Sequence, residues 1–177
     1  MAASVWLLAE CHAADNHPTA GEYPVKAAYL LNFTKFVEWP ATAFTNATAP
    51  FVVGLVGDDP FGSMLQEAFS GQTVGGRPIV LRRFPVGAKI NDCHVLFLSR
   101  SARETQEGLL ATLQGRPILT VGETEQFLEA GGLINFVLTK ERVRFEVNAR
   151  SAERAGLKLG AKLLGVAARV LSESGGK

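Results

Sequence analysis

FVVGLVG, at residues 51–57, is a short, continuously apolar segment that is rich in β-branched side chains. A run of this length and composition predicts a strand that is covered on both faces. The segments HVLFLS (residues 94–99) and PILTV (residues 117–121) have the same composition and predict two more buried strands. Because such strands occur where helices cover both faces of a sheet, the three segments together predict an α/β fold.

Helical and edge-strand patterns occur between these strands. Over residues 25–37 apolar side chains recur at roughly helical spacing, which predicts an amphipathic helix. We expect this helix to end before Pro40, because proline cannot donate a backbone hydrogen bond and disfavours helical geometry in the preceding residue. Residues 79–84 predict a further strand, in which Arg82 and Arg83 indicate a position at the edge of the sheet.

Two segments carry signals for the start of a helix. Asp58 or Asp59, which follow the first strand, are expected to cap a helix with a side-chain carboxylate. Ser101 and Glu104 have the spacing of a capping box, in which a hydroxyl and a carboxylate bind free amides at the helix start. This second helix is expected to continue to about Gln114.

The last third of the chain predicts a hairpin between helices. Residues 133–138 and 142–147 flank a charged turn, and the second segment alternates apolar with charged side chains. Such alternation requires one buried and one solvated face, which favours an antiparallel hairpin that completes the sheet. A short helix over residues 124–130 is expected before the hairpin, and Asn148 is expected to cap the helical turn after it. A helix over residues 157–171 is expected to close the fold.

Together these elements predict the fold class α/β, as a single three-layer domain with a mixed sheet, a C-terminal antiparallel hairpin and flanking helices. We place this domain at residues 23–172 and a disordered tail at residues 173–177. A chain of 177 residues with 47% hydrophobic residues is large enough for one well-packed core. Its formal net charge of +1 provides no general attraction to nucleic acid, so nucleic-acid binding is not expected.

The first residues indicate export. Residues 5–9 form a short apolar run followed by small residues, which is typical of the end of a secretory signal, here cleaved after Ala13. We therefore assign residues 1–13 to a signal peptide and residues 14–22 to a flexible lead-in. The alternatives are lipidation at Cys11, disfavoured because a charged residue precedes the cysteine, and a leader without a targeting role.

The residue types needed for catalysis or metal binding are scarce. Of the three histidines, His12 and His17 lie near the expected cleavage site, so a metal centre is not expected. His94 is the remaining candidate base, and the adjacent Cys93 should point to the opposite face of the same strand. Because cleavage would leave Cys93 as the only cysteine, we interpret it as a small buried apolar side chain. Neither catalysis nor a cofactor is expected.

Three carboxylates are the best candidates for contacts with a ligand. Glu123 follows a predicted strand, and ligands of α/β proteins collect at the carboxyl ends of strands. Asp58 and Asp59 follow another strand in a glycine-containing turn, where their negative charge argues against a phosphate-binding loop. The structural alternatives are a helix cap for the two aspartates and a charge near a helix N-terminus for Glu123.

A family resemblance is carried by five segments in order along the chain. They are YPVKAAYLLNFTKFVEWP (23–40), FVVGLVGDDPFG (51–62), CHVLFLSRS (93–101), LTVGETEQFLEAGGLINFV (119–137) and VRFEVNARSAERAGLKLGAKLL (143–164). In this order they resemble the YfiR-like family of periplasmic regulatory proteins. The resemblance covers nearly the whole mature chain, and the ordered agreement of so many segments makes it specific.

The resemblance implies an exported periplasmic protein of mixed α/β fold, without known catalytic residues or an obligatory cofactor. The best-understood members of the family repress a membrane-bound diguanylate cyclase by docking on its periplasmic sensor region. A second, outer-membrane-associated protein can sequester such a repressor, and a homodimer is compatible with the resemblance. This sequence departs from the family in lacking a mature cysteine pair, which puts redox control in doubt. It also has Gly160 and Ala161 where relatives often have serines.

Two kinds of binding function follow from these observations. For a protein partner, Phe33, Phe36 and Trp39 are candidate contacts, because aromatic side chains anchor interfaces. The alternative for these three residues is a place in the core. A different function would be that of a periplasmic small-ligand-binding sensor or carrier, with a cleft near Gly57, Asp58 and Glu123.

Overall fold

The computed structural model describes residues 21–172 of the chain. The predictions for the signal peptide, for residues 14–20 of the lead-in and for the tail lie outside the described residues, as do Cys11, His12 and His17. In chain order the helices are α1 (Glu22–Phe36), α2 (Met64–Phe69), α3 (Gln106–Leu113), α4 (Ala149–Arg154) and α5 (Ala161–Val166), with the 3₁₀ helices η1 (Ala41–Ala43) and η2 (Arg100–Ala102). The strands are β1 (Val37–Glu38), β2 (Phe51–Val56), β3 (Thr73–Val74), β4 (Arg77–Phe84), β5 (Val95–Leu98), β6 (Leu119–Gly122), β7 (Ile134–Thr139), β8 (Arg142–Asn148), β9 (Lys158–Leu159) and β10 (Arg169–Leu171).

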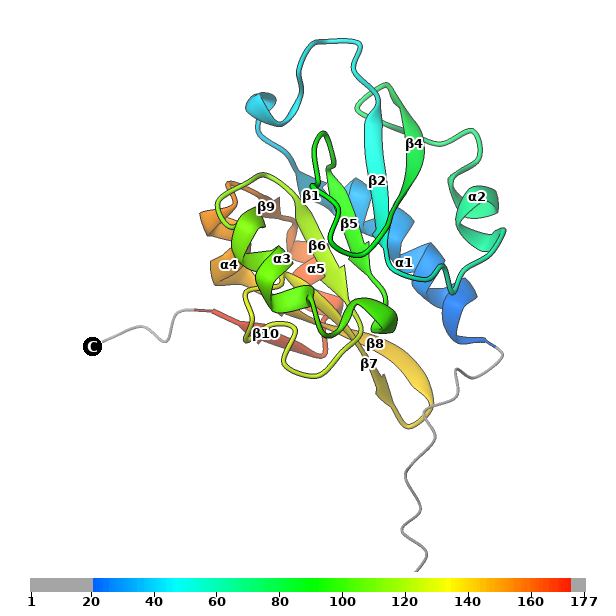
Figure 1. The fold of residues 1–177 in the computed structure, drawn as a ribbon, viewed down its shortest axis with the longest axis vertical. Helices are drawn as coiled ribbons and strands as arrows, with labels where there is room; N and C mark the ends of the chain where they lie inside the picture. Colours follow the sequence, from blue (N-terminus) through cyan, green and yellow to red (C-terminus); the bar gives the residue numbers. More distant parts are fainter. Residues whose placement is uncertain (1–20, 173–177) are drawn as a thin grey trace, which may run out of the picture.

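Within residues 21–172 the strands form an eight-stranded mixed sheet and a separate two-stranded sheet of β1 and β9 (Figure 1). The order across the large sheet is β10-β8-β7-β6-β5-β2-β4-β3. Strands β4, β2, β5, β6 and β7 are parallel, β7 and β8 form an antiparallel hairpin, and β10 joins β8 in parallel. This arrangement confirms the predicted α/β fold with a mixed sheet and a C-terminal hairpin.

The side chains of β2 alternate between two faces of the sheet. Val53 and Leu55 belong to a core cluster that includes residues of α1 and α2, whereas Val52 and Val56 belong to a second cluster with residues of α3. None of these four side chains is more than 3% exposed. The sheet is therefore the middle layer, with α1 and α2 on one face and α3 on the other (Figure 1). Burial of each such side chain contributes about 1.5–3 kcal/mol relative to exposure.

The hairpin of β7 and β8 has the predicted pairing. Phe136 lies opposite Phe145, and both rings are buried against Phe33 of α1, with centroids 5.9 and 5.0 Å from the Phe33 ring. The hairpin extends beyond the neighbouring strands at the bottom of Figure 1. After it, Asn148 caps α4 as predicted, because its side chain accepts a hydrogen bond from the backbone N–H of Ser151 at 3.0 Å.

The predicted helix cap at Asp58 or Asp59 is wrong, because α2 begins later in the chain. The Asp59 carboxylate instead accepts a hydrogen bond from the backbone N–H of Phe61 at 2.9 Å and pairs with Arg83 at 2.6 Å. Gly62 then adopts a φ of +57°, which a right-handed helix does not accommodate. The chain therefore makes an additional turn before the helix.

The predicted capping box at Ser101 and Glu104 is also wrong. Ser101 Oγ accepts a hydrogen bond from the backbone N–H of Asp58 at 2.8 Å and lies 2.9 Å from Ser99 Oγ. Because the hydroxyl binds the neighbouring loop, it is not available to cap a helix. The chain forms η2 at this point, and α3 begins only after Thr105.

Two further predicted helices are wrong in extent or in type. Residues 124–130 form hydrogen-bonded turns, in which Gln126 has a φ of +63°. Within residues 157–171 only α5 is α-helical. The backbone N–H of Gly160 donates to Phe36 O at 2.8 Å, β9 pairs with β1 and β10 pairs with β8. The two ends of this segment therefore form backbone hydrogen bonds with β1, β8 and the end of α1, and only its middle part is helical.

Helix α1 begins earlier than predicted and ends where predicted. Its first residue is Glu22, which is also the last residue of the predicted lead-in of residues 14–22, and its last residue is Phe36, ahead of Pro40. The early start brings Glu22 and Lys26 into the first turns of α1. These are the residues that meet the ends of β5 and β6.

Candidate functional site

The carboxyl ends of β5 and β6 place two side chains next to the start of α1. Arg100 follows β5 by way of Ser99, and Glu123 directly follows β6. Because β5 and β6 are parallel neighbours, their carboxyl ends lie at the same edge of the sheet. On α1, Glu22 contacts Arg100 and Lys26 contacts Glu123. We call Glu22, Lys26, Arg100 and Glu123 the charge cluster.

The charge cluster is held together by ion pairs in a buried position. Lys26 Nζ contacts Glu22 Oε1 and lies 2.5 Å from Glu123 Oε2. Arg100 Nη2 lies 3.1 Å from Glu22 Oε1, and the Arg100 backbone N–H donates to Glu123 Oε1 at 3.2 Å. The side chains of Lys26, Glu22 and Glu123 are 2%, 0% and 1% exposed. Charges buried to this degree are tolerated because each carboxylate faces two cations.

Aromatic rings complete the surroundings of Lys26. Lys26 Nζ lies 4.8 Å from the centroid of the Tyr23 ring and 5.6 Å from that of Phe136, within the range of cation–π attraction. The Tyr23 hydroxyl donates to the Glu123 carboxylate at 3.4 Å. Burial, followed by the charge of Glu123, raises the pKa of Tyr23 to about 12. Tyr23 therefore remains a hydrogen-bond donor at neutral pH.

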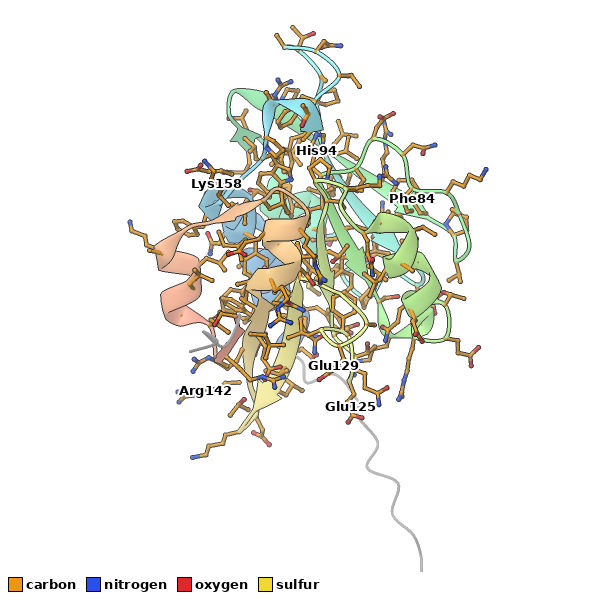
Figure 2. All side chains as sticks on the ribbon, turned by 90° about the vertical axis from the view of Figure 1, so that its left-hand side faces the viewer. Phe84, His94, Glu125, Glu129, Arg142 and Lys158 are labelled. Atoms are coloured by element: carbon orange, nitrogen blue, oxygen red, sulfur yellow. The ribbon has the colours of Figure 1, made fainter. Side chains whose placement is uncertain are left out.

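A cavity of about 420 Å³ opens beside the charge cluster. Its walls are the cluster, the loop of residues 124–129, strand β7, and Glu146 and Arg169 of β8 and β10. Figure 2 shows Glu125 and Glu129 on this loop near the projecting hairpin, with His94 toward the opposite end of the molecule. The cavity is therefore bounded by the sheet edge on one side and by a loop on the other.

The position of the loop depends on Phe127. Its ring is fully buried in the core cluster on the α3 face. A Cβ atom at Gly122 would lie 2.3 Å from this ring, and one at Gly132 would lie 2.2 Å from it. Thr124 also fastens the loop, because its hydroxyl donates to Gln106 Oε1 at 2.6 Å. Glycine on both sides of the ring allows Phe127 to insert and to hold the wall of the cavity.

Cys93 and His94 lie away from the charge cluster, before the amino end of β5. Cys93 is 6% exposed, and burial raises the pKa of its thiol to about 12. This confirms Cys93 as a small buried side chain. His94 stacks on Phe44 and Phe51, on the other face of the strand. Its Nδ1 accepts from the backbone N–H of Val52 at 3.0 Å, and its Nε2 lies 3.1 Å from Ala43 O.

The burial of His94 predicts a loss of stability at mildly acidic pH. Burial lowers the pKa of His94 from its ordinary value of 6.5, so the folded protein keeps the ring neutral at pH values where the unfolded chain binds a proton. The stabilisation is therefore present above pH 6.5 and is lost as pH falls toward the folded-state pKa. We expect the free energy of unfolding in urea to decrease between pH 7 and 5, by at most about 1.4 kcal/mol per pH unit.

The matched variant for this prediction is His94→Phe. It keeps an aromatic ring between Phe44 and Phe51 but has no proton to take up, so its free energy of unfolding should change little over the same pH range. An equal pH slope in both proteins would contradict the role of His94.

The structure places the three predicted carboxylates in two different surroundings. Glu123 belongs to the charge cluster and lines the cavity. Asp58 and Asp59 lie at the end of β2 but do not line this cavity, and Asp59 pairs with Arg83. Sequence reasoning missed Glu22, Lys26 and Arg100, although Glu22 and Lys26 have the i,i+4 spacing of a helical ion pair.

The three aromatic candidates also differ from one another. Phe33 is 2% exposed and belongs to the core, whereas Trp39 is partly buried and donates from Nε1 to His94 O at 3.2 Å. Phe36 is 37% exposed. It lies in an apolar groove of about 490 Å³ between α1 and α5, which we call the α1–α5 groove. The groove is lined by Tyr29, Asn32, Phe33, Phe36, Phe145, Lys162, Leu163, Gly165 and Val166.

Two negative findings apply to residues 21–172 alone. No helix in this part of the chain has the length and apolar character needed to cross a membrane. The same residues contain no group of three or more histidine, cysteine, aspartate or glutamate side chains that could hold a metal ion.

A sequence model of the family described as YfiR/HmsC-like matches residues 23–168. The matched range extends from α1 to beyond α5, and it contains three of the four members of the charge cluster, Lys26, Arg100 and Glu123. No curated protein matches the chain significantly.

Several solved structures resemble the fold, including the following two. One is a conserved domain protein from Vibrio cholerae O1 biovar El Tor strain N16961, with a TM-score of 0.57, 10% identity, and coverage of 84% of this chain and 60% of that one. The other is the ABC domain in complex with L-Trp from Streptococcus pneumonia, with a TM-score of 0.51, 10% identity, and coverage of 68% and 55%. This chain spans little more than half of their length, and at this identity the likeness is one of fold alone.

Proposed function

The chain belongs to the YfiR/HmsC-like family, and from this we propose that it is a periplasmic regulatory protein that represses a membrane-bound diguanylate cyclase. In this proposal an N-terminal signal in residues 1–13 directs export, and the domain docks on the periplasmic sensor region of the cyclase. The observation that supports it is the family match over residues 23–168, which is nearly the whole described fold.

Repression of this kind requires binding and no active-site chemistry. A repressor needs only a higher affinity for the inactive state of its partner, and each tenfold preference corresponds to about 1.4 kcal/mol. An outer-membrane-associated protein that binds the same repressor would relieve the inhibition by competition. A homodimer stays a prediction, which sedimentation of the purified protein would test.

We propose the α1–α5 groove as the surface that contacts the cyclase. Phe36 is 37% and Val166 is 57% exposed, and both line this groove. Apolar side chains gathered at an exposed groove are typical of interaction sites, and aromatic residues such as Phe36 anchor them. Lys162 at the same groove adds a positive charge that would favour an acidic patch on the partner.

The test is deletion of the gene followed by measurement of cyclic-di-GMP. We expect deletion to raise the nucleotide level and the wild-type gene to restore it. Val166→Asp should fail to restore it, because a charge in the groove would weaken an interface by about 2 kcal/mol or more, which is roughly thirtyfold in affinity.

The matched control is Val86→Asp, a valine that is 45% exposed in the loop after β4 and does not line the groove. This variant should restore repression like the wild type. Unchanged cyclic-di-GMP after deletion would overturn the proposed function. Equal behaviour of the two aspartate variants would overturn the assignment of the groove.

A further inference from the structure

The α1–α5 groove is elongated along helix α1. Its lining residues on this helix are Tyr29, Asn32, Phe33 and Phe36, which recur at the spacing of one helix face. From Tyr29 to Phe36 the helix rises by about 10 Å, at about 1.5 Å per residue. The volume of about 490 Å³ is within the roughly 300–1,000 Å³ range of sites for small molecules.

The apolar surface of the groove is open to solvent. Phe36 of α1 and Val166 of α5 are exposed, and Tyr29 is partly exposed above the buried rings of Phe33 and Phe145. At Gly165, which also lines the groove, an added Cβ atom would meet no other atom within 4 Å. A ligand therefore reaches this surface without displacing a side chain.

Two cations at the groove have no anionic partner among residues 21–172. Lys162 lines the groove, is exposed and forms no ion pair in this part of the chain. Arg144 is also exposed, and its Nη2 donates to the lining residue Val166 at its backbone oxygen, at 3.4 Å, which leaves other N–H groups free to bind an anion. The lining contains no aspartate or glutamate. An apolar surface and uncompensated positive charge therefore occur at the same groove.

These features narrow the chemical class of the ligand. An elongated apolar groove suits an extended alkyl chain, which removes the exposed surface of Phe36 and Val166 from water. A cationic ligand would face Lys162 and Arg144, and a neutral one would leave both charges without a partner. The class that matches both properties is an alkyl chain with an anionic head group.

We propose that the α1–α5 groove binds one molecule of a medium-chain fatty acid. Its carboxylate binds Lys162 and Arg144, and its alkyl chain lies along α1 against Tyr29 and Phe36. Binding itself goes beyond the regulatory function and does not depend on it. Because the same groove is the proposed cyclase contact, a bound fatty acid would also compete with the cyclase, and this consequence alone rests on the proposed function.

The first test is isothermal titration of the purified full chain with decanoate, below the concentration at which decanoate forms micelles. We expect saturable binding of one decanoate per chain. From hexanoate through octanoate to decanoate, affinity should rise roughly two- to fourfold for each added methylene, because each methylene leaves water. Absence of saturable binding, or equal affinity for the three acids, would overturn the proposal.

The matched probe for the head group is decyltrimethylammonium, which has the same chain length and the opposite charge. It should bind at least about tenfold more weakly than decanoate. A general effect of amphiphiles on the fold would act equally with both molecules. Equal binding of the two would therefore overturn the proposal.

An anionic lipid surface offers the same chemistry from another source. Sedimentation of the chain with vesicles of phosphatidylglycerol and phosphatidylcholine separates a surface interaction from binding of a single molecule. We expect decanoate to bind in the absence of any vesicle. Sedimentation with the vesicles combined with no saturable binding of decanoate would overturn the proposal.

The second test fills the groove. Gly165→Leu places an apolar side chain in open space on α5, so it should fold and should lower decanoate affinity at least about tenfold. The matched control is Gly108→Leu, a helical glycine of α3 that also has open space and does not line the groove. It should leave the affinity unchanged. Equal affinities of the two variants would overturn the assignment of the groove.

The third test removes the two cations. The double variant Lys162→Gln, Arg144→Gln should lower decanoate affinity roughly three- to tenfold and should not weaken binding of decyltrimethylammonium. Damage to the groove would weaken both probes alike. Lys89→Gln, at an exposed lysine outside the groove, should leave both affinities unchanged.

Unchanged decanoate affinity in the double variant would overturn the role of the two cations and with it the proposal. Failure of decanoate binding would leave the cyclase proposal untouched, because that proposal is read from cyclic-di-GMP after gene deletion.

Discussion

Lys26→Met is expected to lower the free energy of unfolding by about 3–5 kcal/mol. Methionine fills much of the volume of the lysine side chain but removes the ammonium group that contacts both Glu22 and Glu123. The two carboxylates are at most 1% exposed at the side chain and would stay buried with only Arg100 as a nearby cation. Urea unfolding monitored by circular dichroism measures the change.

The matched control is Lys35→Met, which changes an exposed lysine on the same helix. It should alter the free energy of unfolding by no more than about 0.5 kcal/mol. The triple variant Glu22→Gln, Lys26→Met, Glu123→Gln should lose less stability than Lys26→Met alone, because it also removes the unpaired charges. Equal losses for Lys26→Met and Lys35→Met would contradict the ion-pair interpretation.

Phe127→Ala is expected to destabilise the fold by about 3–5 kcal/mol. The ring is 0% exposed, and it fills the space between Gly122 and Gly132. Its loss leaves a void in the core cluster on the α3 face and releases the loop that forms one wall of the cavity. The same urea titration measures the loss of stability.

A double-mutant cycle with Gly122→Ala tests the role of the ring. The three atoms nearest to a Cβ at Gly122 all belong to Phe127, at 2.3–2.6 Å, so Gly122→Ala should cost about 1–3 kcal/mol in the wild type. In the Phe127→Ala background the clash disappears, and this cost should fall by at least about 1 kcal/mol. Gly108→Ala, a helical site with open space, should not be destabilising. Additive effects of the two substitutions would contradict the proposed contact.

The charge cluster and the Phe127 loop connect the stability of the fold with the shape of the cavity. Lys26 fixes the carboxylates at the edge of the sheet, and Phe127 fixes the opposite wall of the cavity. Neither side chain needs to touch a ligand for its loss to reshape the cavity.

Prediction from sequence succeeded for segments in which the pattern of apolar side chains matches the faces that are buried in the structure. The strands near residues 51–57, 94–99 and 117–121 are buried as their apolar runs predicted, and the alternation in residues 142–147 matches the observed hairpin. Glu123 was selected because it follows a strand, and it does lie in the charge cluster. Of the predicted helix caps, the one at Asn148 is correct, whereas those at Asp58 or Asp59 and at Ser101 are wrong.

The failures arose where side chains had partners far away in sequence. Asp59 binds Arg83, and Ser101 binds the backbone of Asp58, so neither is free to start a helix. Residues 157–171 have apolar spacing that suits a helix, yet pairing with β1 and β8 makes both ends of the segment extended. Contacts with residues far away in the sequence determine where these helices begin and where the chain is extended. Local propensity does not describe such contacts.

The amino-acid sequence by itself determined the layered α/β fold, because the position of apolar side chains along each segment dictates which faces must leave water. It did not determine that Glu22, Lys26, Arg100 and Glu123 would form one buried cluster. Only the tertiary structure decided this, by packing the first turns of α1 against the carboxyl ends of β5 and β6. The ion pairs join residues up to 97 positions apart in the sequence, as Lys26 and Glu123 are, and such residues come together only once the sheet has formed.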